Sequence, residues 1–461
     1  MNLLIFFLVY FFIITSVIGY GLFFSQLVKS ETITKSFGYS GLTGLFFLTI
    51  YSYISNIFFA HSELHNIFLL FIGLIFFCYV LLREKKHFNK KKFIISFFVI
   101  SIFFISFLVF KTHDDFPYYH FAYSYYLTQN SLFIGIGPFN HGFRTPSSIF
   151  YMNSLFYLPF IKHYMFHISA AMIMIFANLI LIEKIFNNIK YKQITFLTFF
   201  SLLSFLFINI FFYRLGEHGT DRSAQILILI LLIEILFLTN FSKNIQNDIN
   251  KIFVIIGLVI SLKAFYILYL LLLIPVIYFI IKIKKFHYLF SLYKNKIFIF
   301  LFSIVSLILL TNFFNTGCVV YPVASTCFEN IIWSFDTELV NKMNDWYEQW
   351  SKAGAGPNFR VENPEIYITH FNWVSNWLDN YFFNKVSDFF LGLVLVSIIF
   401  IVIFKSKKEK TKKKNFSYNS LYFYFILLLF FEWFWNHPTL RYGGYVIISL
   451  IFFVPLSYFL S

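Results

Sequence analysis

Charged residues are scarce in this chain of 461 residues. Asp, Glu, Lys and Arg make up 12% of it, with 21 acids against 36 bases, whereas soluble globular chains average roughly 25% charged residues. Hydrophobic residues account for 59% of the chain, and the mean hydropathy is +0.74. This balance excludes an ordinary soluble fold. Because long apolar runs recur along the whole chain, we expect an all-α integral membrane protein.

Other features are also lacking. The chain has three cysteines and no Cys-x-x-Cys motif, so no structural zinc signature is present. We find no internal repeat, and no segment typical of a removable signal peptide, because residues 1–24 are long enough to remain as a span. The net charge of +15 does not indicate nucleic-acid binding, since the lysines collect in short loops beside apolar runs.

Three lysine-rich segments indicate the orientation in the membrane. They are "REKKHFNKKK" (83–92), "KIKKFHYLFSLYKNK" (282–296) and "KSKKEKTKKK" (405–414), and the positive-inside rule places them in the cytoplasm. The result is a prediction of about thirteen transmembrane helices, an N-terminus outside, and two external segments. The spans are expected near 2–24, 41–60, 66–82, 92–110, 165–183, 193–213, 222–240, 252–281 (two short, opposed helices), 297–313, 386–404, 419–435 and 443–460, and the external segments are 111–164 and 314–385.

A rival topology concerns the middle of the chain. If 148–161 crosses the membrane and 252–281 is one helix, the orientation of the helices between them reverses, and the base counts barely distinguish the two arrangements. We favour an interfacial helix at 148–161, and a break at Lys263, because a lysine at mid-bilayer costs several kcal/mol unless it is paired or reaches the surface. Residues 252–262 are too short to cross alone and need a surrounding bundle.

The stretch "KTHDDFPYYH" (111–120) places two adjacent acids where a predicted span leaves the membrane. Adjacent carboxylates repel each other unless cations or donors lie nearby. One of the two carboxylates could act as general base on an acceptor hydroxyl, and the other could help to bind a divalent metal ion. The alternative is a pair of solvated acids at a helix end. The neighbouring candidates for substrate binding are His113, Tyr118 and His120.

Four more polar groups are expected on the same side. "FNHGFRTPSS" (139–148) and "RLGEHGTDR" (214–222) are loops between apolar runs, whereas Lys263 and "NHPTLRYGG" (436–444) carry isolated bases. Such bases suit a phosphate headgroup, which arginine binds in bidentate fashion; ion pairing with acids such as Glu432, or contact with lipid headgroups, is the alternative. The candidate binding residues are His141, Arg144, Glu217, His218, Asp221, Arg222, Lys263, Arg441 and Tyr442. Glu234, deep in a span, is a further functional candidate.

The external segment 314–385 contains Cys318 and Cys327. Outside the cytoplasm such a pair is expected to form a disulfide, with two free thiols as the alternative. Cys78 lies in a predicted span and is interpreted as a core residue. The tryptophans and tyrosines of this segment could stack on sugar rings or anchor the segment at the membrane interface.

The segment from Asp114 to Phe160 resembles the first external loop of GT-C glycosyltransferases, such as protein O-mannosyltransferases and aminoarabinose transferases. In that family an Asp-[Asp/Glu] pair precedes an amphipathic helix, a glycine-containing turn and a second interfacial helix; here these correspond to 118–129 and 146–161. "PTLRYGGY" is similar to motifs near the C-terminus of such enzymes, and "GCVVYPVASTC" resembles a loop of bacterial polytopic membrane proteins. The chain differs in having Asp as the second acid, Thr-Pro-Ser in place of Pro-Pro-Leu, and three spans before the core.

The resemblance implies four regions: N-terminal extra helices (1–91), a GT-C-like core (92–313), the external segment 314–385, and C-terminal helices (386–461). It implies an inverting transferase of the bacterial plasma membrane that moves a sugar from a polyprenyl-phosphate donor to a glycan, lipid or protein on the outer face. By position, the resemblance makes Asp114 the base that deprotonates the acceptor hydroxyl, while Asp115 assists it or binds a metal ion. A divalent metal ion, held by Asp115 and Glu217, is the one cofactor considered. A lipid or polysaccharide flippase is the alternative function, although transporters commonly show internal repeats. The sugar, the acceptor and the oligomeric state are not readable from the sequence.

Overall fold

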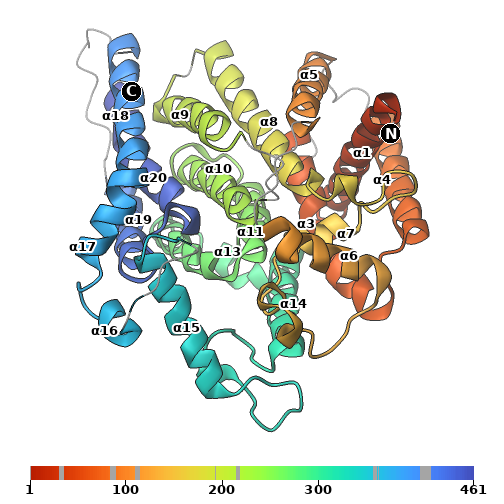
Figure 1. Ribbon diagram of the computed structural model, residues 1–461. Coiled ribbons are helices and arrows are strands. Elements are labelled where there is room, and N and C mark those ends of the chain that lie inside the picture. Colours follow the sequence, from red (N-terminus) through yellow and green to blue (C-terminus); the bar gives the residue numbers. More distant parts are fainter. Residues whose placement is uncertain are drawn as a thin grey trace.

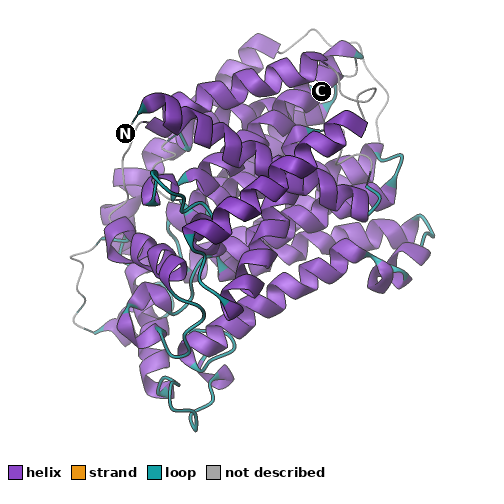
Figure 2. Cartoon of the chain, turned by 90° about the vertical axis from the view of Figure 1, so that its right-hand side faces the viewer, coloured by secondary structure: helices purple, strands orange, loops and turns teal. Residues whose placement is uncertain are grey.

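The computed structural model of this chain describes residues 2–30, 36–83, 90–108, 115–192, 194–213, 219–356, 361, 363–404 and 417–461. Within these residues the regular structure is helical, and the pairing between extended segments is limited to two isolated bridges. Figure 2 shows helices throughout the described chain and no strand. The protein is therefore all-α in its described part, as the composition predicts.

Ten helical segments are long and apolar enough to cross a membrane. They are α1 (Leu3–Leu27), α3 (Phe37–Phe58), α4 (Glu63–Arg83), α5 (Lys90–Leu108), η4 with α8 (His163–Met165 and Ile168–Lys190), α10 (Thr220–Phe241), α11 (Ile245–Leu262), η6 with α12 (Ala264–Leu273 and Ile274–Lys282), α14 (Lys296–Thr316), and α17, η9 and α18 (Val374–Trp377, Leu378–Val386 and Ser387–Phe404). Three shorter apolar helices accompany them: α9 (Phe196–Phe211), α19 (Ser417–Asn436) and α20 (Gly444–Leu460). The chain is thus a multi-pass membrane protein.

The remaining helices are short and connect the long ones. They are η1 (Phe116–His120), α6 (Phe121–Gln129), η2 (Gly137–Phe139), η3 (His141–Phe143), α7 (Ser148–Ser154), α13 (His287–Phe290), η7 (Leu292–Lys294), η8 (Ala324–Thr326), α15 (Thr337–Lys352), α16 (Pro364–Ile368) and η10 (Leu440–Tyr442). In lipid every backbone polar group needs an internal partner, which is why the apolar runs form helices. Figure 1 shows α10 and α11 near the middle of the molecule, with long helices such as α8, α9 and α14 around them.

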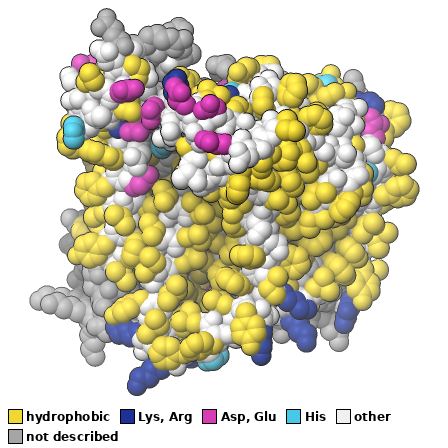
Figure 3. Space-filling view, turned by 90° about the horizontal axis from the view of Figure 1, so that it is seen from below, with side chains coloured by type: hydrophobic (Ala, Val, Ile, Leu, Met, Phe, Trp, Pro, Cys, Tyr) yellow, Lys and Arg dark blue, Asp and Glu magenta, His cyan; other side chains and the backbone are white. Residues whose placement is uncertain are grey.

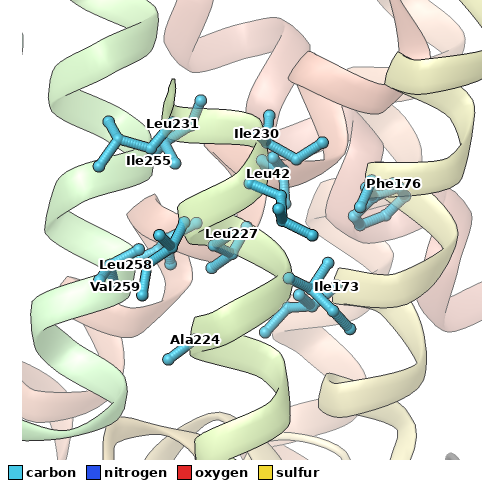
Figure 4. Packing of buried hydrophobic residues seen from close by; sticks show 14 of the residues in the cluster. Leu42, Ile173, Phe176, Ala224, Leu227, Ile230, Leu231, Ile255, Leu258 and Val259 are labelled. Carbon is cyan, nitrogen blue, oxygen red and sulfur yellow. The ribbon is translucent and has the colours of Figure 1, made fainter. Parts of the chain in front are cut away.

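Helix α10 lies at the centre of the bundle, packed against α8, α9, α11 and α20. Figure 4 shows Leu227 and Leu231 of α10 facing Leu258 of α11, while Ile173 and Phe176 of α8 approach from the other side. All five side chains are at most 1% exposed. Because α10 is surrounded by protein, its first turn is held at a defined place and can position functional side chains.

The segment after Asp115 agrees with the expected first helix and differs from the expected second one. Helices η1 and α6 run continuously from Phe116 to Gln129, whereas the predicted interfacial helix 146–161 is reduced to the seven residues of α7, all of them buried. Its apolar side chains Ile149 and Phe150 point into the core instead of lying at a membrane surface. Seven residues span about 10 Å, so 148–161 does not cross a membrane as a helix either.

The chain breaks at Lys263, as predicted, but the helix before it is longer than predicted. Helix α11 begins at Ile245 and has 18 residues, about 27 Å at 1.5 Å per residue, because Asp248 and Lys251 are paired inside the bundle and do not end it. Lys263 itself has an extended backbone with φ −160° and ψ 130°. The prediction placed the start of this helix at residue 252. Because the helix begins at Ile245 instead, it is long enough to cross.

Charges are separated between the two ends of the bundle. Exposed acids include Glu329, Asp336, Glu338, Glu365 and Asp379 at what we call the acidic end, and exposed bases include Lys90, Lys91, Lys190, Lys284 and Lys285 at the opposite, basic end. Figure 3 shows a broad hydrophobic surface with Asp and Glu gathered along one edge and Lys and Arg mostly along the other. An apolar belt between two charged rims is the surface expected of a protein embedded in a bilayer.

Helix α15 and the turns before it project from the acidic end, at the lower edge of Figure 1. Lys352, at the end of α15, is buried with 1% of its side chain exposed. Its ammonium pairs with Glu348, donates to the carbonyl of Ile368, and lies 5.3 Å from the ring centre of Trp373. This buried cation attaches α15 to the helices that follow it.

Candidate functional site

Arg441 joins two carboxylates from distant parts of the chain. Its Nη2 donates to Oδ2 of Asp115 at 2.6 Å, and its Nε donates to Oδ2 of Asp221 at 2.8 Å. Asp115 precedes η1, Asp221 lies in the first turn of α10, and Arg441 lies in η10 between α19 and α20. Three separate elements of the acidic end therefore meet at one guanidinium.

Lys263 completes this group, which we call the charged cluster: Asp115, Asp221, Lys263 and Arg441. Its Nζ lies 2.7 Å from Oδ1 of Asp221, so the two oxygens of that carboxylate each bind a different cation. The extended backbone at the end of α11 directs the lysine across to α10. Two acids and two bases give the cluster no net charge.

Helix α10 also fixes the backbone that carries Arg441. Gln225, one turn beyond Asp221, donates from Nε2 to the carbonyl of Arg441 at 3.0 Å and accepts from the amide of Val446 at 3.0 Å. Gly443 follows with φ +101°, a conformation that a residue with a side chain adopts at a cost. The turn between α19 and α20 is thus held from both sides, and the guanidinium has little freedom to move.

Burial is uneven within the cluster. The side chain of Asp221 is 6% exposed, whereas those of Lys263 and Arg441 are 29% and 30% exposed. Burial lowers the pKa of Lys263, and the neighbouring Asp221 opposes this effect. Burial alone would also lower the pKa of Arg441, but the carboxylate of Asp221, with Tyr442 and Asp115, raises it well above its ordinary value. Because nearly a third of each side chain is exposed, both cations keep part of their surface available to an anion.

Aromatic side chains surround the cluster. The Tyr119 hydroxyl donates to Oδ2 of Asp115 at 3.3 Å, and the ring of Tyr442 lies 4.7 Å from Nζ of Lys263 in a cation–π contact. Burial, and then the charge of Asp115, raise the pKa of the Tyr119 phenol, which stays a hydrogen-bond donor. These rings limit the access of water to the ion pairs, which strengthens them.

A groove lies next to the cluster and shares Tyr442 with it. It is a small, partly open hollow, with a cavity volume of about 30 Å³. Side chains of η6 and of the α19–α20 region line it: Phe265, Leu268, Tyr269, Leu429, Glu432, Trp433, His437, Tyr442 and Ile447. The lining is mainly apolar and aromatic, which suits a hydrocarbon chain or a ring. Glu432 accepts a hydrogen bond from Asn436, and the partners of Lys263 and Arg441 are Asp115 and Asp221 instead.

The structure brings five of the predicted site residues together, namely Asp115, Asp221, Lys263, Arg441 and Tyr442. The other described candidates lie around them or elsewhere. His141 is at the rim, between the cluster and α15; burial, and the nearby Arg144, lower the pKa of its imidazole to about 4. Arg144 points to the long loop, where it donates to the Tyr321 hydroxyl at 2.8 Å. His120 is buried against Tyr119 and Phe150, Tyr118 is 58% exposed, and Arg222 is partly exposed in the first turn of α10.

Four predicted residues lie outside the described part of the chain: His113, Asp114, Glu217 and His218. The structure therefore says nothing about the proposed base Asp114, or about a metal site that includes Glu217. Among the described residues no group of three or more His, Cys, Asp or Glu side chains is arranged to hold a metal ion. The metal ion thus remains a prediction, carried by Asp115 and Glu217.

Sequence reasoning missed several residues that build the site. Gln225 and Trp350 carry no charge and form no motif, and only the rotation of their helices directs them to the cluster. Tyr119 lies in the polar stretch 111–120 but was given no role of its own. The one available signal was position: Tyr119 follows the acid pair within four residues, and Gln225 lies one helical turn beyond Asp221.

Two other predicted features lie apart from the cluster. Cys318 and Cys327 form a disulfide, as predicted, whereas Cys78 is free and exposed on α4, so its interpretation as a core residue was wrong. Glu234, fully buried in α10 towards the basic end, is paired with Lys184 of α8 at 2.6 Å and accepts a hydrogen bond from Tyr39 of α3. Lys251 of α11 lies 3.7 Å from the other oxygen of Glu234. The partners that the sequence left unnamed thus come from three neighbouring helices, and Glu234 links them at a distance from the charged cluster.

Comparison with known proteins gives a family without an assigned activity. Residues 1–448 match the model of a family described as a domain of unknown function (DUF8201). The match covers nearly the whole chain, so the protein belongs to this family. Neither the curated proteins nor the solved structures gave a match.

Proposed function

For this member of the DUF8201 family, we propose an inverting glycosyltransferase of GT-C type that uses a polyprenyl-phosphate-linked sugar. The protein would lie in a bacterial plasma membrane with thirteen spans, the ten long helices and the three shorter ones. Its lysine-rich basic end would face the cytoplasm. The charged cluster, at the acidic end, would then act on the outer face.

The cations support a lipid phosphate as part of the substrate. Lys263 and Arg441 each expose nearly a third of their side chains, while Asp221 beneath them is buried. Asp115 is 25% exposed, so an anion that reaches the cluster can contact both cations on the side away from this carboxylate. A leaving polyprenyl phosphate needs this kind of stabilisation, because its charge grows as the glycosidic bond breaks.

The groove supports a donor with a long apolar tail. It begins at Tyr442, whose ring also contacts Lys263, and continues between η6 and α19 along apolar side chains such as Leu268 and Leu429. A lipid with its phosphate at Lys263 would have its first isoprene units in this groove. The sugar would then lie on the other side of Tyr442, towards Asp115.

The acids support the activation of an acceptor hydroxyl. In the proposed reaction Asp114 takes the proton of that hydroxyl, its oxygen attacks the anomeric carbon, and the bond from that carbon to the phosphate oxygen breaks with inversion. The polyprenyl phosphate leaves as an anion held by Lys263 and Arg441. Asp115 holds Arg441 in place through their 2.6 Å hydrogen bond. A divalent ion, if it takes part, would bind Asp115 and Glu217.

One observation carries the proposal: two partly exposed cations, fixed by the buried Asp221 and the partly exposed Asp115, lie beside an apolar groove at one end of a membrane bundle. The test is transfer from a panel of polyprenyl-phosphate sugars by the purified protein in lipid nanodiscs. We expect transfer by the wild type and none by Asp114→Asn, with Asp379→Asn as the matched control at an exposed position. Full activity of Asp114→Asn would reject this base. Lipid translocation without transfer would support the flippase instead.

A further inference from the structure

Helix α15 carries a second chemical surface close to the charged cluster. Its segment "DWYEQW" (345–350) places Trp346 and Trp350 one turn apart, with Asp345 and Gln349 also one turn apart beside them. Trp346 is 43% exposed. In the described chain neither the Asp345 carboxylate nor the Gln349 amide has a protein hydrogen-bond partner. The helix thus presents flat rings next to free polar groups.

Contacts between rings connect this surface to the site. The rings of Trp350 and Tyr442 lie 5.7 Å apart, and Tyr442 in turn contacts the ammonium of Lys263. At the other end of the surface, the ring of Trp346 lies 5.6 Å from that of His141. A ligand on α15 would therefore extend directly to the place where the proposed transfer occurs.

His141 adds an unsatisfied polar group between the two sites. Its Nε2 atom is buried and has no hydrogen-bond partner within the described residues. Because burial keeps the pKa of this imidazole near 4, the ring is neutral at physiological pH and can donate or accept one hydrogen bond. A buried polar atom without a partner is costly, so a small rotation of the ring that brings this atom to the hydroxyl group of a ligand would be favourable.

The chemistry of this surface fits a saccharide. The C–H face of a pyranose packs on a flat aromatic ring, while its hydroxyls pair with carboxylate, amide and imidazole groups, and α15 with His141 offers all of these. Anchoring in the membrane interface is the other common role of exposed tryptophan. That role explains Trp346 but not Trp350 and His141, which turn towards protein groups of the site.

We propose that Asp345, Trp346, Gln349 and Trp350, together with His141, form a binding site for a saccharide, which is the acceptor of the transferase. Only the claim that the saccharide is an acceptor rests on the proposed function, because the binding itself does not depend on transfer. It selects a glycan among the three acceptor classes left open by the sequence. The sugar unit to be extended would lie over Tyr442, with its free hydroxyl towards Asp115.

The experiment measures binding separately from transfer. The full chain in nanodiscs is titrated with a panel of neutral and acidic oligosaccharides by calorimetry, and with undecaprenyl phosphate in parallel. Trp346→Ala and Trp350→Ala are compared with Trp435→Ala, a matched control because Trp435 is 42% exposed. We expect at least one oligosaccharide to bind, its affinity to fall at least 10-fold in the two α15 variants and less than 2-fold in the control, and lipid binding to be unchanged in all three.

The outcomes separate the two proposals. Loss of saccharide binding in the α15 variants supports the site even if no donor supports transfer, in which case only the transferase proposal fails. Failure of every oligosaccharide to bind the wild type overturns the site, and so does an equal loss in Trp435→Ala. If Trp346→Ala weakens lipid binding and leaves saccharide binding unchanged, the residue is a membrane anchor and the inference is wrong.

Discussion

Arg441 and Asp115 are 326 positions apart in the chain, yet Nη2 of the arginine lies 2.6 Å from Oδ2 of the aspartate. The two residues belong to the last and the first polar segments of the site. Because the same guanidinium also binds Asp221, its planar shape decides the geometry of the cluster. A single charge without that shape would hold one carboxylate and release the other.

Arg441→Lys tests this requirement for shape. Lysine keeps the charge but has one ammonium on a flexible chain, so it cannot bind Asp115 and Asp221 in the same geometry. We expect transfer to fall about 100-fold, the usual effect of removing one oriented donor, with the protein still folded. The measurement is initial rate with the best donor of the panel. Lys342→Arg, at an exposed pair with Glu338, is the control, and equal rates for both variants would contradict the prediction.

Asp221→Asn tests the buried acid. The change leaves Lys263 and Arg441 facing a neutral amide, and removing one partner of a buried ion pair typically costs about 3–5 kcal/mol. We expect a clear loss of thermal stability in detergent, measured by the unfolding of the purified protein. Glu338→Gln removes an exposed pair on α15 and is expected to change nothing measurable. Similar stability of the two variants would show that Asp221 carries little of the energy of the cluster.

Leu268→Trp tests the groove. Leu268 lines the groove next to Tyr269, so a larger side chain there should occupy the space assigned to the lipid tail. We expect the KM for a long-chain donor to rise at least 10-fold, while a donor with a very short lipid is affected little. Leu391→Trp, at a position 63% exposed on α18, serves as the matched control. An equal rise in KM for short-chain and long-chain donors would show that the groove does not bind the lipid tail.

Cys318→Ser tests which side of the membrane the acidic end faces. In the wild type the partner Cys327 is held in the disulfide, whereas in the variant its thiol is free and partly exposed. If the acidic end faces outward, a membrane-impermeant maleimide added to intact cells should label the variant and not the wild type. Labelling only after the cells are opened would reverse the orientation. The double variant Cys318→Ser, Cys327→Ser excludes reaction at Cys78.

The burial of His61 leads us to expect that the folded protein loses stability in acid. It lies between α3 and α4, fully buried, with its ring bonded to the hydroxyls of Ser55 and Ser154. Burial, and then the nearby His65, lower the pKa of its imidazole to about 3. The unfolded chain takes up a proton below pH 6.5 and the folded one does not, so stability is complete above pH 6.5 and is lost towards pH 3.

The expected loss is about 2 kcal/mol between pH 6.5 and 5, at about 1.4 kcal/mol per pH unit for one group. The measurement is the melting temperature in detergent across this range. His61→Gln should make the dependence shallower by the share of one group, because His141 and His437 also have lowered pKa values. His370→Gln, at an exposed position, should leave the dependence as in the wild type. A melting temperature that falls equally in both variants would assign the effect to other groups.

Much of the helix order could be predicted from apolar runs, because a membrane span needs length and composition that a single sequence shows directly. The break at Lys263 was predictable for the same reason, since a charge interrupts the run. The depth of α7 was not predictable. Its Ile149 and Phe150 suit a membrane surface or a core equally well, and only the packing of the helices around α7 decides between them.

The site was predictable in its charges and not in its geometry. The isolated bases Lys263 and Arg441 were recognisable, because they are unusual on a side poor in lysine and arginine. Which acid each of them would meet depends on how α10, α11 and η10 rotate about their axes, and the sequence carries no local sign of that. For the same reason Glu234 had no readable partner, although Lys184 and Tyr39 surround it.

The distance along the chain between Asp115 and Arg441 also has a consequence for biogenesis. At about 5–20 residues per second, the ribosome needs at least about 16 seconds to reach Arg441 after it has passed Asp115. During that interval the carboxylates of Asp115 and Asp221 must remain in water or bind other cations. The charged cluster can therefore form only when α19 and α20 join the bundle, so a chain that ends before residue 441 would insert most of its helices and still lack the site.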